Sequence, residues 1–103
     1  MHFLLFYAVT PDYLERRGEF RGDHLKKVWA AHYNRTFVLG GALQEPLDTA
    51  RLLFSGDSKE VVEEFARTNP YVMNELVKSW KVCEWKTVGG ALAMTPVHPA
   101  KWQ

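Results

Sequence analysis

The sequence predicts an α+β domain of the ferredoxin-like type, in which the order β-α-β-β-α-β folds into a four-stranded antiparallel sheet with both helices on one face. Three observations support this prediction. The first ten residues are almost entirely apolar. Two later segments place apolar residues at helical spacing. Two short apolar runs lie between these segments and are separated by the turn-forming residues EPLDTA.

The first strand, Met1–Thr10, is predicted to lie at the centre of the sheet. Alternate side chains of a strand point to opposite faces, and both sets are apolar here: Phe3, Leu5, Tyr7 and Val9 on one face, Leu4, Phe6 and Ala8 on the other. A run of about nine apolar residues is too short for a membrane-spanning helix, which needs about 20. It also lacks the basic start and the cleavage site of a secretion signal, so we expect no membrane partner.

The composition is that of one ordinary globular domain, with 103 residues, 47% of them hydrophobic and 24% charged. The net charge is +1 and the basic residues are scattered, which argues against a nucleic-acid partner. Cys83 is the single cysteine, so an intramolecular disulfide is excluded and a cytoplasmic location is expected.

The first helix is predicted to follow a polar loop. Pro11–Gly18 is interpreted as this loop, with room for one helical turn, and the helix is expected over Glu19–Asn34. Its buried stripe is predicted to consist of Leu25, Val28, Trp29 and His32. His24 lies at the border of this stripe.

The second and third strands are predicted over Thr36–Gln44 and Arg51–Ser55, with a turn over Glu45–Ala50. The Gly40-Gly41 pair inside the second strand is unusual, because glycine has no side chain to pack. Such a pair marks a bulge, or a close approach by another backbone or a ligand, and the sequence leaves these alternatives open.

The second helix is predicted to begin with a capping box, in which Asp57 caps and Glu60 reaches back. It is expected to extend to Arg67 and to bury Val61, Val62, Phe65 and Ala66. Asn69-Pro70 then begins a short helix, with Asn69 as its N-cap. The residues expected to be buried there are Val72, Met73, Leu76 and Val77.

The fourth strand is predicted over Trp80–Val88, with Trp80 and Val82 on one face and Cys83 and Trp85 on the other. Residues 89–103 are then a tail without regular structure. Because the helices cover one face of the sheet only, the other apolar face would be exposed in a monomer, which soluble proteins rarely tolerate. We therefore expect a homodimer that packs sheet against sheet with two-fold symmetry.

Several motifs follow one another along residues 1–88: FLLFYAV, Arg21-Gly22-Asp23-His24-Leu25, LGGAL, Asn69-Pro70-Tyr71-Val72, and Trp80-Lys81-Val82 with Trp85. Their order and spacing resemble the YciI-like (YCII-related domain) family of the dimeric α+β barrel superfamily. The most specific parts of this resemblance are the Arg-x-x-His-Leu pattern of the first helix and the x-Pro-Tyr pattern that begins the last helix.

The resemblance implies a ferredoxin-like protomer in a dimeric α+β barrel. In this family a His on the first helix and an Asp in an Asp-Pro-Tyr motif form a dyad, and a few members are dehydrochlorinases of hydroxyquinones. The family His corresponds to His24. Position 69 is Asn where the family has Asp. An Asn gives the imidazole a hydrogen-bond partner without a charge, and in a serine-protease triad the same exchange lowers the rate about 10⁴-fold.

Two interpretations of His24 remain open. An imidazole titrates near pH 6.5, so His24 is a candidate general acid or base, and the alternative is a helix-edge side chain with an ordinary hydrogen bond. Asn69 either positions His24 or only caps its own helix, and the two roles are compatible. Asp23 points about 100° away around the helix, so it is a poor partner for His24.

Candidate substrate-binding residues are Arg21 for an anionic group, Tyr7 and Tyr71 for an aromatic pocket, and Gly40 and Gly41 for the room that they leave. Trp29 is a further candidate for the aromatic pocket. The alternatives are a solvated side chain for Arg21, core packing for the three aromatic residues and a bulge for the two glycines. His32 is interpreted as a core histidine and Cys83 as a packing residue. No metal site is expected, because the eight-residue spacing of His24 and His32 is not that of a helical zinc pair.

Two functional hypotheses follow. The first is a cofactor-independent isomerase or lyase, similar to the dehydrochlorinases, in which His24 transfers a proton on a small cyclic or quinone-type substrate and Asn69 positions it. The alternative is a non-catalytic dimeric protein that binds a small molecule or serves as a scaffold, in which the His-Asp dyad has decayed.

Overall fold

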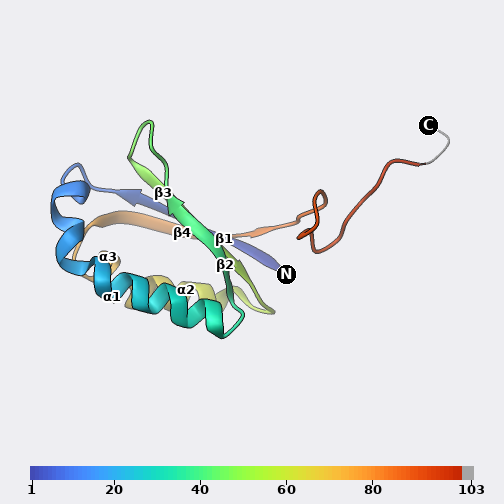
Figure 1. Ribbon diagram of the computed structural model, residues 1–103, viewed down its shortest axis with the longest axis horizontal. Coiled ribbons are helices and arrows are strands. Elements are labelled where there is room, and N and C mark those ends of the chain that lie inside the picture. Colours follow the sequence, from blue (N-terminus) through green and yellow to red (C-terminus); the bar gives the residue numbers. More distant parts are fainter. Residues whose placement is uncertain (101–103) are drawn as a thin grey trace.

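The computed structural model describes residues 1–100 and has the predicted order of elements (Figure 1). These are β1 (His2–Val9), α1 (Tyr13–Tyr33), β2 (Phe37–Ala42), β3 (Thr49–Ser55), α2 (Lys59–Thr68), α3 (Pro70–Met73) and β4 (Val77–Trp85). The strands form one antiparallel sheet in the order β2-β3-β1-β4. The helices all lie on one face of it (Figure 1). The predicted ferredoxin-like α+β fold is confirmed.

The core lies between the sheet and the helices. Strand β1 contributes Phe3, Leu5, Tyr7 and Val9, all buried as predicted. Directly paired residues of an antiparallel sheet share a face, and Leu5 lies opposite Leu52 of β3 and Val82 of β4. Helix α2 covers this face with Val62, Phe65 and Ala66.

The open face of the sheet carries the alternate residues of the same strands. Leu4, Phe6 and Ala8 of β1 are only half-buried there. The Phe6 ring lies between two cations, at 4.5 Å from its centroid to Arg51 Cζ and 5.0 Å to Lys81 Nζ. Cys83, opposite Leu4, is exposed, so the prediction that it packs is wrong for a single chain.

Helix α1 begins at Tyr13, so the predicted loop over Pro11–Gly18 is wrong. Asp12 is the N-cap residue, and its carbonyl oxygen accepts a hydrogen bond from Arg16 N at 3.1 Å. Tyr13 is buried, and its ring packs edge to face on Tyr71 with centroids 5.6 Å apart. Burial of an aromatic side chain outweighs the cost of about 1 kcal/mol that Gly18 brings to a helix.

The buried side of α1 is rotated relative to the prediction. Val28 is buried, but Leu25, Trp29 and His32 are exposed, so the interpretation of His32 as a core histidine is wrong. The side chains on the inner side of the helix are Tyr13, Phe20, His24, Val28 and Ala31. The missed first turns explain the error, because Tyr13 and Phe20 align with His24 and not with Trp29.

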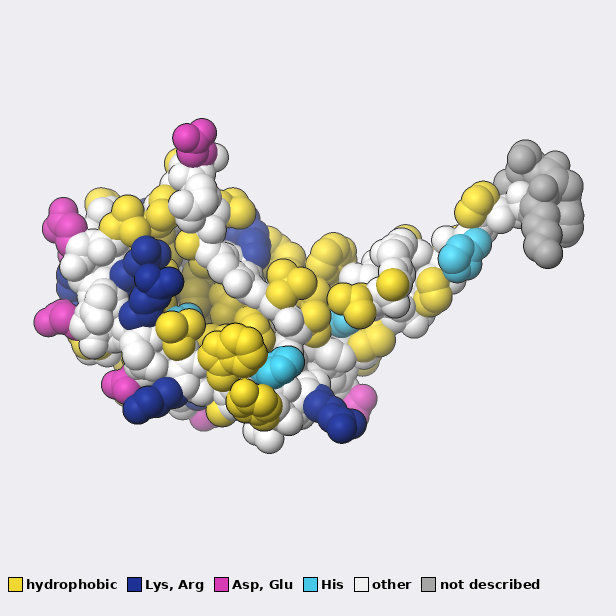
Figure 2. All heavy atoms as spheres, in the orientation of Figure 1, with side chains coloured by type: hydrophobic (Ala, Val, Ile, Leu, Met, Phe, Trp, Pro, Cys, Tyr) yellow, Lys and Arg dark blue, Asp and Glu magenta, His cyan; other side chains and the backbone are white. Residues whose placement is uncertain are grey.

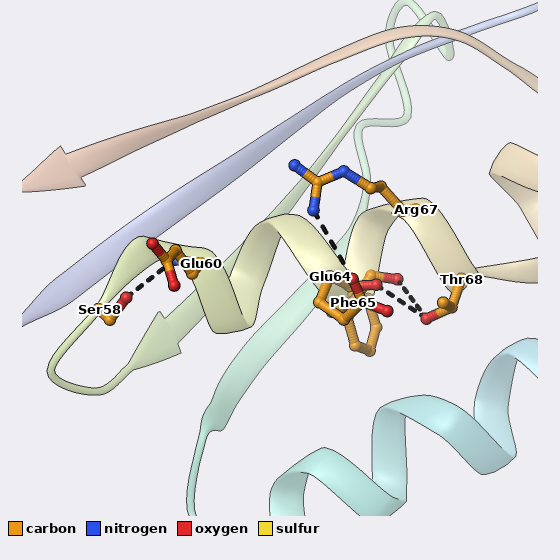
Figure 3. Close-up of polar contacts among 6 residues, drawn as sticks. All are labelled: Ser58, Glu60, Glu64, Phe65, Arg67 and Thr68. Atoms are coloured by element: carbon orange, nitrogen blue, oxygen red, sulfur yellow. Dashed lines mark hydrogen bonds and ion pairs between the residues drawn. The ribbon is translucent and has the colours of Figure 1, made fainter.

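Helix α2 is capped by Ser58 and not by the predicted Asp57 (Figure 3). Ser58 has the extended backbone of an N-cap, and its Oγ accepts a hydrogen bond from Glu60 N at 3.1 Å. At the other end Thr68 Oγ1 donates to Glu64 O at 2.8 Å. Val61 points outward and is exposed, in contrast to the prediction.

Helix α3 is a single turn, which corrects the predicted extent of this segment. Asn69 caps it as predicted, but Met73 is 67% exposed. Leu76 and Val77 are buried beyond the helix, because the chain already turns into the sheet there. Strand β4 consequently begins and ends earlier than the predicted range Trp80–Val88.

The Gly40-Gly41 pair lies in β2, just after a shift of register between Phe37 and Leu39. A Cβ atom on Gly40 would lie 3.0 Å from the carbonyl oxygen of Arg51, whereas one on Gly41 would meet nothing within 4 Å. Gly40 is therefore required by a close approach of β3. Strand β3 begins at Thr49, inside the predicted turn Glu45–Ala50.

Residues 86–100 form no helix or strand, and the chain leads away from the domain here (Figure 1). A turn holds the start of this tail, because Val97 N donates to Val88 O at 2.8 Å. Trp102, which we assigned to the tail, lies outside the described residues. In the part of the chain that the structure describes, no helix is long and apolar enough to cross a membrane.

Candidate functional site

A cavity of about 190 Å³ lies between α1 and the sheet. Figure 2 shows the hollow from the side of Figure 1, with hydrophobic side chains at its floor and a basic cluster at one edge. Its polar and charged walls are Tyr7 of β1, Arg17, Arg21 and His24 of α1, and Tyr71 of α3. The rest of the wall is Val9, Tyr13, Leu25, Val28, Phe37, Gly40, Gly41, Ala42, Ala50 and Leu52.

His24 and Asn69 meet at the inner side of this cavity. His24 Nδ1 lies 3.0 Å from Asn69 Oδ1, although the two residues are 45 positions apart in the chain. Asn69 lies at the junction of α2 and α3 and is 0% exposed. The helix junction therefore fixes one end of the contact, and the third turn of α1 presents the other.

The cap of α3 determines which nitrogen of His24 carries the proton. Asn69 Oδ1 also accepts a hydrogen bond from Tyr71 N at 3.0 Å, and a backbone N–H can only donate. The amide oxygen of Asn69 therefore faces both Tyr71 and His24. Because this oxygen only accepts, His24 Nδ1 must be the protonated nitrogen. The neutral ring then has a free lone pair on Nε2.

The surroundings of His24 favour its neutral form. Its ring stacks on Tyr71, with centroids 4.0 Å apart and an angle of 14° between the planes. Burial lowers the pKa of His24 below its usual range, and the charge of Arg21 lowers it further, while the hydrogen bond with Asn69 partly offsets the shift. A neutral imidazole with a free Nε2 is a proton acceptor at neutral pH.

Two polar atoms beside this pair lack a hydrogen-bond partner of good geometry among the described residues. They are Tyr7 Oη and Asn69 Nδ2, and both are buried. Burial raises the pKa of the Tyr7 phenol above its usual range, with a partial offset from the neighbouring Asn69 amide. Burial also raises the pKa of Tyr71 to about 12. Both phenols are thus protonated donors, and Tyr7 still has its donor unused.

The charged part of the wall is wholly basic. Arg17 and Arg21 are four residues apart on α1 and therefore lie one turn apart on the same side. Arg17 Cζ lies 5.7 Å from the centroid of the Tyr13 ring. No Asp or Glu is among the described residues that line the cavity.

The structure brings together most of the residues that the sequence singled out. Six of them line the cavity, namely Tyr7, Arg21, His24, Gly40, Gly41 and Tyr71, and Asn69 contacts His24 from behind. Trp29 lines neither the cavity nor the core and is 53% exposed. Arg17 was missed, although its four-residue spacing from Arg21 was a signal in the sequence.

The described residues contain no group of three or more His, Cys, Asp or Glu side chains arranged to hold a metal ion. The donors that face the cavity are the phenols, the guanidinium groups and one imidazole. This set is suited to binding an organic ligand through hydrogen bonds.

No known protein-family model matches the sequence, and a search of curated proteins gives no match either. Among solved structures, the chain resembles 5-chloro-2-hydroxyhydroquinone dehydrochlorinase from Burkholderia phenoliruptrix AC1100 in complex with 2,5-dihydroxybenzoquinone. The TM-score is 0.71 at 20% sequence identity, over 84% of this chain and 95% of that chain. At this identity the likeness establishes the fold, which is the predicted α+β fold.

Proposed function

We propose that this protein is a cofactor-independent isomerase or lyase of the YciI-like type, which uses His24 to transfer a proton on a small cyclic or quinone-type substrate. The observation that carries the proposal is the contact of His24 Nδ1 with Asn69 Oδ1 at 3.0 Å in the wall of a cavity. It leaves a neutral imidazole with Nε2 free. The structural likeness to a quinone dehydrochlorinase supports the same reaction class.

In this proposal each group has a task. His24 Nε2 accepts a proton from an acidic C–H or O–H of the ring and returns it at another atom, which isomerises the substrate, or the proton leaves together with an anionic group, which is an elimination. Asn69 holds the ring and its tautomer, and it is a positioning residue.

Asn69 does not need a charge for this task. In a protease triad the Asn variant fails because it selects the wrong tautomer. Here the N–H of Tyr71 orients the amide, so that Asn69 presents its oxygen to Nδ1. The lost carboxylate removes the electrostatic stabilisation of an imidazolium, and a slower enzyme is expected rather than an inactive one.

The test is turnover of small enolisable lactones and chlorinated hydroxyquinones, followed by NMR. His24→Ala is expected to lower kcat/KM by about 10²- to 10⁴-fold, the usual contribution of a general base. His32→Ala is the matched control, because His32 is an exposed histidine on the same helix. Equal rates for His24→Ala and the wild type would contradict the proposal.

A non-catalytic binding protein is the second candidate, and the Asn at position 69 favours it. It predicts that ligands bind in the cavity and that none is converted. The two candidates separate in a single experiment, since any turnover that His24→Ala removes excludes a purely binding role.

We also propose that the open face of the sheet binds a second copy of this chain. The support is the apolar set on that face, which includes Leu4, Phe6, Leu39 and Trp85. The start of the tail covers only one end of the face, where His2 is buried with its Nδ1 2.7 Å from Thr87 Oγ1. Such a surface is typical of a subunit interface. The single Cys83 on this face fits a reducing, cytoplasmic setting.

A further inference from the structure

We propose that the ligand of the cavity is a single-ring organic acid, with a planar six-membered ring and a carboxylate or similarly acidic group that Arg17 and Arg21 bind. This inference rests on the proposed function, because it names the substrate class of the same cavity. It is carried by the size of the cavity and by its charge.

The size limits the ligand to one ring. The cavity measures about 190 Å³, whereas an engineered apolar cavity of about 150 Å³ holds a benzene molecule. Sites for drug-sized ligands measure about 300–1,000 Å³. A six-membered ring with one or two small substituents therefore fills this space.

The charge requires an anion. Arg17 and Arg21 line the cavity and take part in neither ion pair of the described residues, which join Arg16 to Asp12 and Arg67 to Glu64. No carboxylate in the cavity wall balances them. A guanidinium binds a carboxylate through two parallel hydrogen bonds, and two guanidinium groups one turn apart present a site for such a group.

Tyr7 and the apolar residues form the remaining part of the cavity wall. Tyr7 is 2% exposed and lines the cavity, yet its hydroxyl has no hydrogen-bond partner of good geometry among the described residues. A buried hydroxyl without a partner is unfavourable, and native proteins rarely leave one. The Tyr7 hydroxyl, however, is buried behind the cavity wall beside Asn69, so it does not take part in ligand binding in this inference. The apolar lining, which includes Val28 and Leu52, is suited to the faces of a ring.

The test compares 4-hydroxybenzoate with 4-hydroxybenzamide by titration calorimetry. These probes share the ring and the hydroxyl and differ in charge. We expect the wild type to bind 4-hydroxybenzoate about tenfold more tightly or better, since hydrogen bonds between ionised partners are about twice as strong as neutral ones. This preference should weaken with added salt.

Substitutions test whether Arg17 and Arg21 cause the preference for the anionic probe. The double variant Arg17→Gln/Arg21→Gln is expected to lose the preference, whereas Arg67→Gln, which removes the same kind of charge from the surface of α2, keeps it. Equal binding of the two probes, binding of neither, or a preference that survives in the double variant would overturn the proposal.

The same titrations separate this inference from the proposed reaction. His24→Ala keeps both arginines, so it is expected to keep the preference for the anion. A preserved preference without turnover of any compound leaves the ligand class standing and contradicts the reaction. Turnover of uncharged substrates, together with equal binding of the two probes, supports the reaction and contradicts the ligand class.

Discussion

The two faces of strand β1 carry similar apolar residues but have different surroundings. On one face Phe3, Leu5 and Tyr7 are buried under the helices and form the floor of the core and the cavity. On the other face Leu4 and Phe6 are half-buried, and the helices of the described residues lie on the opposite side of the sheet. The apolar side chains on the covered face pack within the single chain, whereas those on the open face need a second surface to become fully buried.

The covered face also contrasts with the open face in its use of charge. In the cavity, Arg17 and Arg21 add positive charge to the wall, and the charge of Arg21 adds to the effect of burial in lowering the pKa of the half-buried His24. On the open face, Arg51 and Lys81 lie over the Phe6 ring, where cation–π contacts hold them. The first arrangement is suited to a small anion, and the second covers an apolar surface.

The largest effect is expected from charged substitutions on the open face of the sheet. The double variant Leu39→Glu/Trp85→Glu places two acidic groups on this face, where both residues are exposed in the single chain. We expect the dimer to dissociate, with a loss of at least about 10²-fold in association, because charges must be desolvated in the interface. Analytical ultracentrifugation measures this change. Val61→Glu on the outer side of α2 is the control, and dissociation of that variant as well would contradict the assignment of the interface.

The next largest effect is expected at Gly40 and Gly41, two adjacent glycines that line the cavity. Gly40→Ala is expected to lower the free energy of unfolding by about 1–3 kcal/mol, because the new Cβ would crowd the Arg51 carbonyl oxygen. Gly41→Ala has open space around its Cβ, so a much smaller change is expected. Chemical denaturation of the two variants gives the comparison. Equal losses would show that the approach of β3 does not explain Gly40.

A smaller effect tests the charge of the residue behind His24. Asn69→Asp keeps an N-cap for α3 and places a carboxylate beside His24 Nδ1, so the pKa of His24 is expected to rise by about one unit or more. NMR titration of the imidazole measures it. Gln44→Glu adds the same charge at an exposed position and serves as the control. An unchanged pKa in Asn69→Asp would exclude the direct contact.

The smallest effect is the pH dependence of stability. The pKa of His24 is lower in the folded chain than its value of about 6.5 in the unfolded chain, so the unfolded chain binds a proton more readily. The contribution of the neutral ring is fully present above about pH 6.5 and is lost as the pH falls through the folded pKa. Denaturation of the wild type and of His24→Gln between about pH 5 and 8 checks this. A wild type that gains stability relative to His24→Gln as the pH falls would contradict the lowered pKa.

Much of the fold was predictable because its signals are local and strong. The apolar side chains on both faces of residues 1–10 placed β1 at the centre, and the Asn69-Pro70 pair marked the start of α3. The start of α1 was missed because Gly18 and the polar residues around it indicate a loop, while the stabilising contact of Tyr13 with Tyr71 is long-range. The cap of α2 was misplaced by one residue, since Asp57 and Ser58 are both good caps.

The candidate site was predictable as a list of residues but not as an arrangement. The family resemblance paired His24 with position 69, and the structure places the two side chains in contact. The sequence does not show that one amide oxygen serves both the helix cap and the imidazole, because this depends on where α1 crosses the α2–α3 junction. Arg17 was missed for the reason that its helical turn was interpreted as a loop.

The protonation state of His24 decides whether this residue is a base held by Asn69. Nitrogen-15 NMR of the two imidazole nitrogens near neutral pH distinguishes the neutral tautomers and the cation. We expect a neutral His24 ring with its proton on Nδ1 in the wild type. In Asn69→Ala we expect this preference for one tautomer to be lost. A ring that carries its proton on Nε2, or one that is charged at neutral pH, would contradict the assignment of His24 as a base held by Asn69.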